Sequence, residues 1–193
     1  MTQSMAHTLH IPLADPAWKL LMQSGVVVRC TVGITFDLML RREFGLTEEQ
    51  IAPVDSIILD GMPVDEPEHT VVPGGSRLAL ASGLPGITGL SMKKGSAVRG
   101  LRSGITHTRS AEVTPTPGEI TLSLYSLTLP ELAGHFLARG VGVTPEQLVR
   151  YSRFALEDAV LLDKTPYKAK ELAGALAGFP ADCRIALTAF VMS

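Results

Sequence analysis

The chain has 193 residues, of which 46% are hydrophobic and 19% are charged. This composition excludes intrinsic disorder, which combines low hydrophobicity with high net charge, and the length fits one large domain or two small ones. A formal net charge of −2 argues against a dedicated nucleic-acid binder, because such proteins carry a basic excess, so we expect no nucleic-acid partner.

Helical and strand patterns alternate in the first half of the chain. Asp15 and Pro16 can begin a helix that Gly25 ends. Apolar side chains at positions 36, 39, 40 and 44 have helical spacing, and Gly45 can end that second helix. Short β-branched or apolar runs, separated by turns at Asp60-Gly61 and Pro73-Gly74-Gly75, predict the strands Val26–Cys30, Ser56–Leu59 and Arg77–Ala81.

The second half begins with a strand whose two faces differ. Between Gly118 and Leu129, Ile120, Leu122 and Leu124 alternate with Thr121, Ser123 and Tyr125, which predicts a strand with one apolar face and one hydroxyl-bearing face. Thr128 and Glu131 have the spacing of a capping box, which predicts a helix directly afterwards. Thr165-Pro166 is expected to open a further helix through Leu176, and Cys183–Met192 to form the last strand.

The two halves show matching segments in the same order. Both contain a Thr-x-x-Gln pattern, in which Thr47 or Thr144 can cap a helix and Gln50 or Gln147 can reach back to the cap. The matching pairs are Gly45–Ile51 with Gly142–Leu148, Ile57–Asp60 with Val160–Asp163, and Arg77–Leu80 with Arg184–Leu187. We interpret the pattern as a tandem duplication, which predicts the same strand order in residues 25–84 and 118–192. The alternative is two unrelated α+β halves with common turn chemistry.

The first half also resembles the β-grasp sulfur carriers of thiamine and molybdopterin biosynthesis. The resemblance covers Gly25 to Leu84 and rests on Ile58–Asp65 and Val72–Leu80. It implies a β-grasp (ubiquitin-like) fold. The carriers end in a free Gly-Gly that is adenylated and thiocarboxylated, whereas here the strand continues into Gly83-Leu84-Pro85-Gly86, so the resemblance is applied to the fold and not to the activity.

These observations predict an α+β protein with two related β-grasp-like halves. The expected segments are an N-terminal helix within residues 1–24, a first half at 25–85, a basic Gly-rich connector at 86–117 and a second half at 118–193. Two cysteines cannot form a disulfide framework, the N-terminus lacks the pattern of a secretory signal, and no apolar run is long enough to span a membrane. We therefore expect a soluble, cytoplasmic protein with no membrane span.

The connector is the candidate binding segment. It holds five basic residues and one acidic residue between Gly86 and Pro117, together with five glycines whose exposed N–H groups can contact an anion. Arginine side chains can bind phosphate or carboxylate through two parallel hydrogen bonds. The predicted ligand-binding residues are Lys93, Lys94, Gly95, Ser96, Arg99 and Arg102. The alternative is a structural connector whose cations pair with carboxylates of the same chain.

Three classes of function are compatible with these residues. The favoured class is a non-catalytic binding protein that recognises an anionic small molecule or an acidic protein partner through the connector. The second is an enzyme with an anion site between the halves, in which Tyr125, His107 and Asp60 meet in space. The third is an oligomeric structural protein, a homo-oligomer that pairs exposed strand edges. No motif of a known catalytic or metal site is present, so no catalytic or metal-ligating residue is assigned and no cofactor is predicted.

Overall fold

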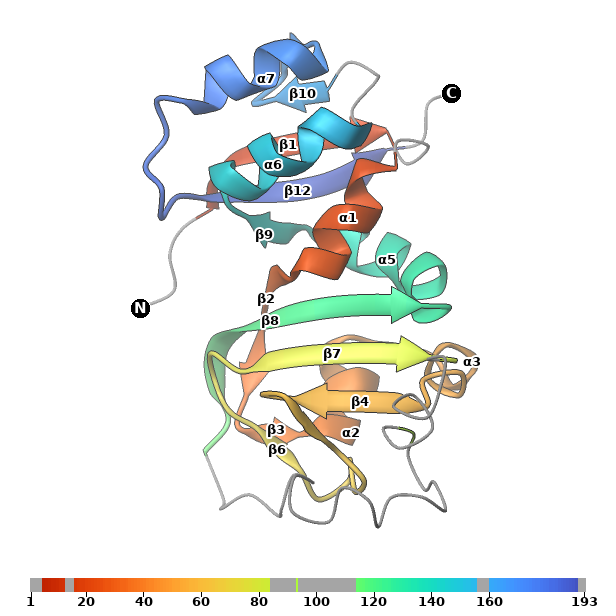
Figure 1. Ribbon diagram of the computed structural model, residues 1–193. Coiled ribbons are helices and arrows are strands. Elements are labelled where there is room, and N and C mark those ends of the chain that lie inside the picture. The colour runs from red at the N-terminus through yellow and green to blue at the C-terminus, as the bar shows by residue number, and fades with distance from the viewer. Residues whose placement is uncertain (1–4, 13–15, 84–92, 94–113, 156–159, 191–193) are drawn as a thin grey trace. The chain divides into compact units, whose positions relative to one another are not determined.

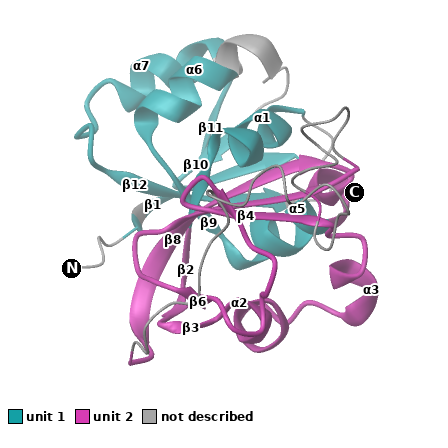
Figure 2. Cartoon of the chain, turned by 60° about the horizontal axis from the view of Figure 1, so that its bottom comes forward, with its two compact units in different colours: residues 1–27, 132–193 teal, residues 28–131 magenta. Residues whose placement is uncertain are grey.

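The computed structural model describes residues 5–12, 16–83, 93, 114–155 and 160–190. The chain forms two compact units, shown in Figure 2. Unit 1 consists of residues 1–27 and 132–193, and unit 2 consists of residues 28–131. Unit 1 is therefore built from both ends of the chain.

Unit 2 is a mixed sheet with short helices. Its strands are β2 (Val26–Val32, which begins in unit 1), β3 (Ile34–Thr35), β4 (Ser56–Leu59), β5 (Met62–Pro63), β6 (Val71–Val72), β7 (Arg77–Ser82) and β8 (Thr116–Ser126). Its helices are α2 (Phe36–Leu38), the π-helix η1 (Met39–Glu43), α3 (Glu48–Ile51) and the first residues of α5 (Thr128–Arg139).

The main sheet of unit 2 has the order β2-β8-β7-β4-β5, and β3 pairs separately with β6. Figure 1 shows β8, β7 and β4 side by side. Strand β7 runs parallel to β8 and antiparallel to β4. The tight turn between β4 and β5 contains Asp60 and Gly61 at φ values of 49° and 84°, a conformation that this residue pair tolerates. The predicted strands and the predicted turn are confirmed.

The core of unit 2 follows the predicted periodicities. On β8, Ile120, Leu122 and Leu124 are buried, as the alternation predicts. The four apolar residues with helical spacing are also buried: Phe36, Met39, Leu40 and Phe44. The helix that carries them is partly a π-helix, because the Phe44 N–H donates to the Met39 carbonyl, five residues earlier, at 2.9 Å.

Unit 1 combines the N-terminal strand and helix with the last third of the chain. Its strands are β1 (Met5–Pro12), the start of β2, β9 (Val141–Val143), β10 (Val160–Leu162), β11 (Thr165–Tyr167) and β12 (Arg184–Phe190). Its helices are α1 (Ala17–Ser24), most of α5, α6 (Pro145–Ala155) and α7 (Ala169–Leu176), and α6 packs against both α1 and α7.

Strand β1 lies inside the sheet of unit 1, whose order is β11-β10-β1-β12-β9. It runs parallel to β12 and antiparallel to β10, and its Leu9 and Ile11 side chains are buried. The sequence pattern predicted the helix that follows but not this strand. The predicted helix α1 is confirmed, with Pro16 at its start and Gly25, at a φ of 96°, at its end, while Asp15 lies outside the described residues.

The helix predicted at Thr128 is confirmed as α5, whereas the helix predicted from Thr165 begins later than expected. Residues Thr165–Tyr167 form β11 in a hairpin with β10, so that helix begins at Ala169. Thr128 is itself the first residue of α5, and its hydroxyl donates to the carbonyls of Tyr125 and Leu80, at 2.7 and 3.0 Å.

The structure does not show the duplication in its predicted form. Both capping boxes are present, at Thr47 and at Thr144. However, the last strand of the first half, β7, lies next to β4, whereas the last strand of the second half, β12, lies between β1 and β9. The strand orders of residues 25–84 and 118–192 therefore differ.

Cys30 is buried, Cys183 is half-buried, and both are free thiols. Among the residues described above, no helix has the length and apolar character needed to cross a membrane.

Candidate functional site

Of the predicted ligand-binding residues, the structure describes Lys93. Its exposed ammonium lies 3.3 Å from Oδ2 of Asp55, a carboxylate that also accepts hydrogen bonds from the Ser56 hydroxyl and the Gly83 N–H. The Lys93 ammonium therefore pairs with a carboxylate of the same chain, as expected if the connector is structural. The other predicted residues, Lys94, Gly95, Ser96, Arg99 and Arg102, lie outside the described residues, so their contact with an anion stays a prediction.

A first candidate site, called the sheet cavity here, is a hollow of about 370 Å³ in unit 2. It lies over the β4–β5 turn and strands β4, β7 and β8. Its lining residues are Ile58, Asp60, Gly61, Arg77, Leu78, Ala79, Thr121, Ser123 and Tyr125.

Strand register explains how the sheet cavity forms. The parallel pairing of β7 and β8 places Arg77 beside Thr121 and Ala79 beside Ser123, and the antiparallel pairing of β4 places Ile58 on the other side of Ala79. Because Ala79, on the middle strand β7, has only a methyl side chain, it leaves space above the sheet between its two neighbours. The hydroxyl-bearing face that the sequence predicts on β8 thus becomes one wall of a cavity.

The polar groups of the sheet cavity differ in how they are held. Asp60 is fixed: its Oδ1 accepts from the Arg77 N–H at 2.7 Å, and its own N–H donates to the Arg77 carbonyl at 2.8 Å. In contrast, the Arg77 guanidinium and the hydroxyls of Thr121 and Ser123 make no hydrogen bond or ion pair within the described part of the chain. These donors are available to a ligand.

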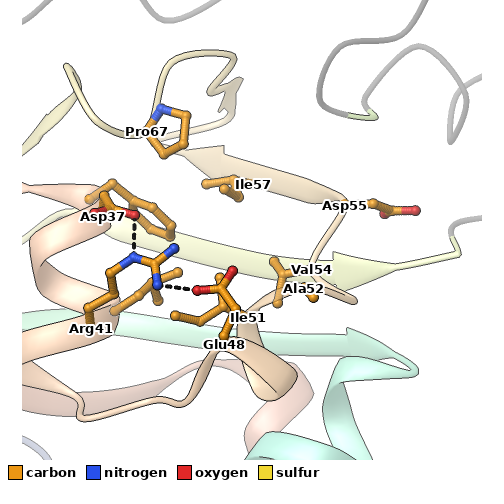
Figure 3. A pocket seen from close by; sticks show the side chains of 11 residues that line it. Asp37, Arg41, Glu48, Ile51, Ala52, Val54, Asp55, Ile57 and Pro67 are labelled. Atoms are coloured by element: carbon orange, nitrogen blue, oxygen red, sulfur yellow. Dashed lines mark hydrogen bonds and ion pairs between the residues drawn. The ribbon is translucent and has the colours of Figure 1, made fainter.

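A second candidate site, called the helix cavity here, has a volume of about 290 Å³ and lies among α2, η1, α3 and β4 of unit 2 (Figure 3). Most of its lining is apolar, and four charged residues complete it. The lining residues are Phe36, Asp37, Leu40, Arg41, Glu48, Ile51, Ala52, Val54, Asp55, Ile57 and Pro67.

An ion-pair network fixes one wall of the helix cavity. The Arg41 Nε donates to Asp37 Oδ1 at 2.8 Å, and its Nη1 donates to Glu48 Oε2. Figure 3 shows Arg41 between the two carboxylates, with Asp55 on the far side. These hydrogen bonds lower the pKa of Glu48 and raise the pKa of Arg41, first through Glu48 and then through Asp37.

Arg41 belongs to the π-helix η1, and short π-helical segments occur frequently at functional sites. The helix cavity was not predicted from the sequence. The i,i+4 spacing of Asp37 and Arg41 is a sequence signal for the first ion pair. Nothing in the sequence placed Glu48 next to Arg41, because that contact requires the turn at Gly45.

The polar residues of β1 in unit 1 have structural partners. The His7 Nδ1 lies 2.6 Å from Asp163 Oδ2, and the His7 ring contacts the Phe179 ring in a tilted arrangement, with the ring centroids 4.3 Å apart. The His10 Nδ1 lies 2.6 Å from the Thr188 hydroxyl. In the described ranges, no group of three or more His, Cys, Asp or Glu side chains is placed to hold a metal ion.

No protein-family model, curated protein or solved structure matches the chain. Of the three residues named for the enzyme alternative, Asp60 and Tyr125 line the same cavity, whereas His107 lies outside the described residues.

Proposed function

We propose that this chain is a non-catalytic binding protein and that the sheet cavity holds a small anion that also carries hydroxyl groups. The observation that supports the proposal is the arrangement of the Arg77 guanidinium and the Thr121 and Ser123 hydroxyls around one hollow, where these side-chain groups have no hydrogen-bond partner among the described residues. Small-molecule sites combine a concave shape with a few convergent polar groups, and this cavity has both.

Each wall suggests a role for part of the ligand. The Arg77 guanidinium can bind a carboxylate or phosphate through two parallel hydrogen bonds. The hydroxyls of Thr121 and Ser123 can each donate and accept, which suits the hydroxyl groups of a polyol. The remaining oxygen of the fixed Asp60 carboxylate can accept a ligand hydroxyl, and Ile58 can contact its carbon atoms.

Binding is favoured over catalysis by the composition of this lining. A serine or threonine nucleophile needs a neighbouring base, most often histidine, to remove its proton. No histidine, lysine or cysteine is among the described lining residues, and one oxygen of Asp60 is already occupied by the Arg77 N–H.

The test uses D-gluconate as the probe, with sorbitol as the neutral polyol and propionate as the anion without hydroxyls. Titrations followed by NMR should show saturable shifts of the Ala79, Thr121 and Ser123 amides with gluconate at millimolar affinity, about −4 kcal/mol. Arg77→Gln should weaken binding at least about tenfold, because hydrogen bonds to charged groups contribute about 1.5–3 kcal/mol.

Two further variants control this experiment. Ala79→Leu fills the hollow and should abolish the shifts, while Arg42→Gln removes an exposed cation of the same unit outside the lining and should leave them unchanged. The proposal is wrong if gluconate causes no saturable shift, or if Ala79→Leu binds it as the unaltered chain does.

The basic connector is a proposed additional contact for an anionic ligand or an acidic partner. Lys93 pairs with Asp55 of the same chain, which fits the structural alternative, so the contact is proposed for Lys94, Gly95, Ser96, Arg99 and Arg102. A double variant, Arg99→Ala with Arg102→Ala, should weaken gluconate binding and reduce its salt dependence, because exposed charges are screened within about 8–10 Å. Unchanged affinity and salt dependence would remove the connector from the proposal without affecting the sheet cavity.

The β-grasp interpretation remains a proposal for unit 2. It is supported by the helical segment between β2 and β4, by the central position of β7 antiparallel to β4, and by the Asp60-Gly61 turn. The strand parallel to β7 is β8, which follows β7 in the chain.

The proposed duplication takes a revised form, in which one repeat runs from β1 to β7 and the other from β8 to β12. Each then begins with a strand and a helix, continues through a Thr-capped helix and a hairpin, and ends with a strand. In both units the first strand of one repeat pairs in parallel with the last strand of the other, β8 with β7 and β1 with β12. Cross-strand NOEs between Leu9 and Leu187 and between Leu80 and Leu124 test these pairings.

A further inference from the structure

We infer that the helix cavity is a second ligand site, which takes a small organic cation with an apolar body. The site is separate from the sheet cavity, since the two linings share no residue. The inference therefore does not depend on the function proposed for the sheet cavity.

The interior of the helix cavity suits an apolar ligand body. Phe36, Leu40, Val54 and Ile57 are buried and form its lining together with Ile51, Ala52 and Pro67. A hollow of about 290 Å³ lies at the lower end of the size range of small-molecule sites, so it suits a ligand of about one ring.

The charges of the lining favour a cation. Asp37, Glu48 and Asp55 carry three negative charges. Arg41 pairs with the first two and the Lys93 ammonium lies 3.3 Å from Asp55, which leaves an excess of one negative charge around the lining. Arg41 is already hydrogen-bonded to two of these carboxylates, so an anionic ligand would approach Arg41 against their negative charges. An ammonium group can instead share the carboxylate oxygens through charge-assisted hydrogen bonds.

The carboxylates are also held in place before a ligand arrives. Arg41 fixes Asp37 and Glu48, and the capping box of Thr47 and Gln50 fixes the start of helix α3, on which Glu48 lies. Preorganised groups lose little conformational freedom on binding, which favours affinity. A metal ion fits less well, because the described residues offer no cluster of three metal-binding side chains here.

The experiment compares three probes of one shape on the full chain at pH 7: benzylammonium, benzyl alcohol and benzoate. Benzylammonium should give saturable NMR shifts of the Leu40, Ile51 and Ile57 amides. Benzyl alcohol should bind at least about fivefold more weakly and benzoate should not saturate, because only the first probe pairs with the carboxylates.

Matched variants separate a site from general charge attraction. Glu48→Gln should weaken benzylammonium binding at least about fivefold, while Glu49→Gln, the same change one residue along α3 and outside the lining, should leave it unchanged. Ala52→Leu, on the cavity wall in Figure 3, should reduce the affinity for both benzylammonium and benzyl alcohol.

The inference is overturned if benzoate binds as tightly as benzylammonium, if Glu48→Gln and Glu49→Gln have equal effects, or if Ala52→Leu leaves binding intact. Gluconate binding in the sheet cavity should be the same in all three variants, so failure of one site is distinguishable from failure of the other.

Discussion

Two aspartates in hairpin turns fix a neighbouring strand in each unit. Asp60 and Asp163 both have a φ of 49°, and each donates its N–H to a carbonyl of the adjacent antiparallel strand while its carboxylate accepts the N–H of the same residue. The partner is Arg77 in unit 2 and Thr8 in unit 1. Aspartate suits this position because it tolerates positive φ and supplies the acceptor.

Asp163→Asn is expected to reduce the pH dependence of stability. The hydrogen bond from the Thr8 N–H, followed by that from His7, lowers the pKa of Asp163 in the folded chain. The ionised group therefore stabilises the fold above its ordinary pKa, and this contribution is lost as the pH falls through the folded-state pKa. Since the side chain is 45% exposed, we expect a loss of about 1 kcal/mol at pH 7.

The measurement is urea unfolding of the unaltered protein and of the Asp163→Asn variant between neutral pH and about pH 2, where the carboxylate becomes protonated. The difference in the free energy of unfolding should shrink as the pH falls. A difference that is constant with pH would show that the charge of Asp163 contributes nothing.

At the scale of elements, the two capping boxes have the same local chemistry and different surroundings. The Thr47 N–H and the Thr144 N–H each donate to the glutamine three residues on, at 2.9 Å. Gln147 also donates through Nε2 to the Gly25 carbonyl at 2.7 Å and to the Ser24 hydroxyl at 3.2 Å. It therefore connects the start of α6 to the end of α1.

Replacement of each glutamine by glutamate should separate these two roles. Glutamate still accepts in a capping box but cannot donate, so Gln147→Glu should lower the free energy of unfolding by about 1–2 kcal/mol. Gln50→Glu is the matched control and should change it by less than about 0.5 kcal/mol. Chemical denaturation measures both, and equal effects would contradict a tie between α6 and α1.

At the scale of the whole molecule, unit 1 depends on a strand from the far end of the chain. Leu9 on β1 is fully buried between β10 and β12, whereas Leu80 on β7 is fully buried in unit 2. A substitution that destabilises the core of one unit should therefore increase local unfolding in that unit first.

Leu9→Ala should speed amide hydrogen exchange in β10 and β12 and leave β4 and β7 unchanged, while Leu80→Ala should do the reverse. Each substitution should cost about 2–5 kcal/mol, because it removes buried methyl groups and leaves a cavity. Hydrogen exchange followed by NMR measures both variants. Uniformly faster exchange in either one would show that the two units unfold together.

Features that depend on neighbouring residues were predictable from the amino-acid sequence. The caps at Thr47 and Thr144, the Asp60-Gly61 turn and the alternating faces of β8 follow from local hydrogen bonding and backbone sterics, which a few consecutive residues specify. The hydroxyl-bearing wall of the sheet cavity was therefore predictable, although the cavity was not.

Strand pairing and the contacts between distant side chains depend instead on how the whole chain packs. The pairing of β1 with β12 joins residues at opposite ends of the chain, and the contact of Arg41 with Glu48 requires the chain to turn between two helices. The hollow above Ala79 exists because β4, β7 and β8 align in one register. Such contacts form when distant segments close into a common core, and no local pattern of residues encodes that choice.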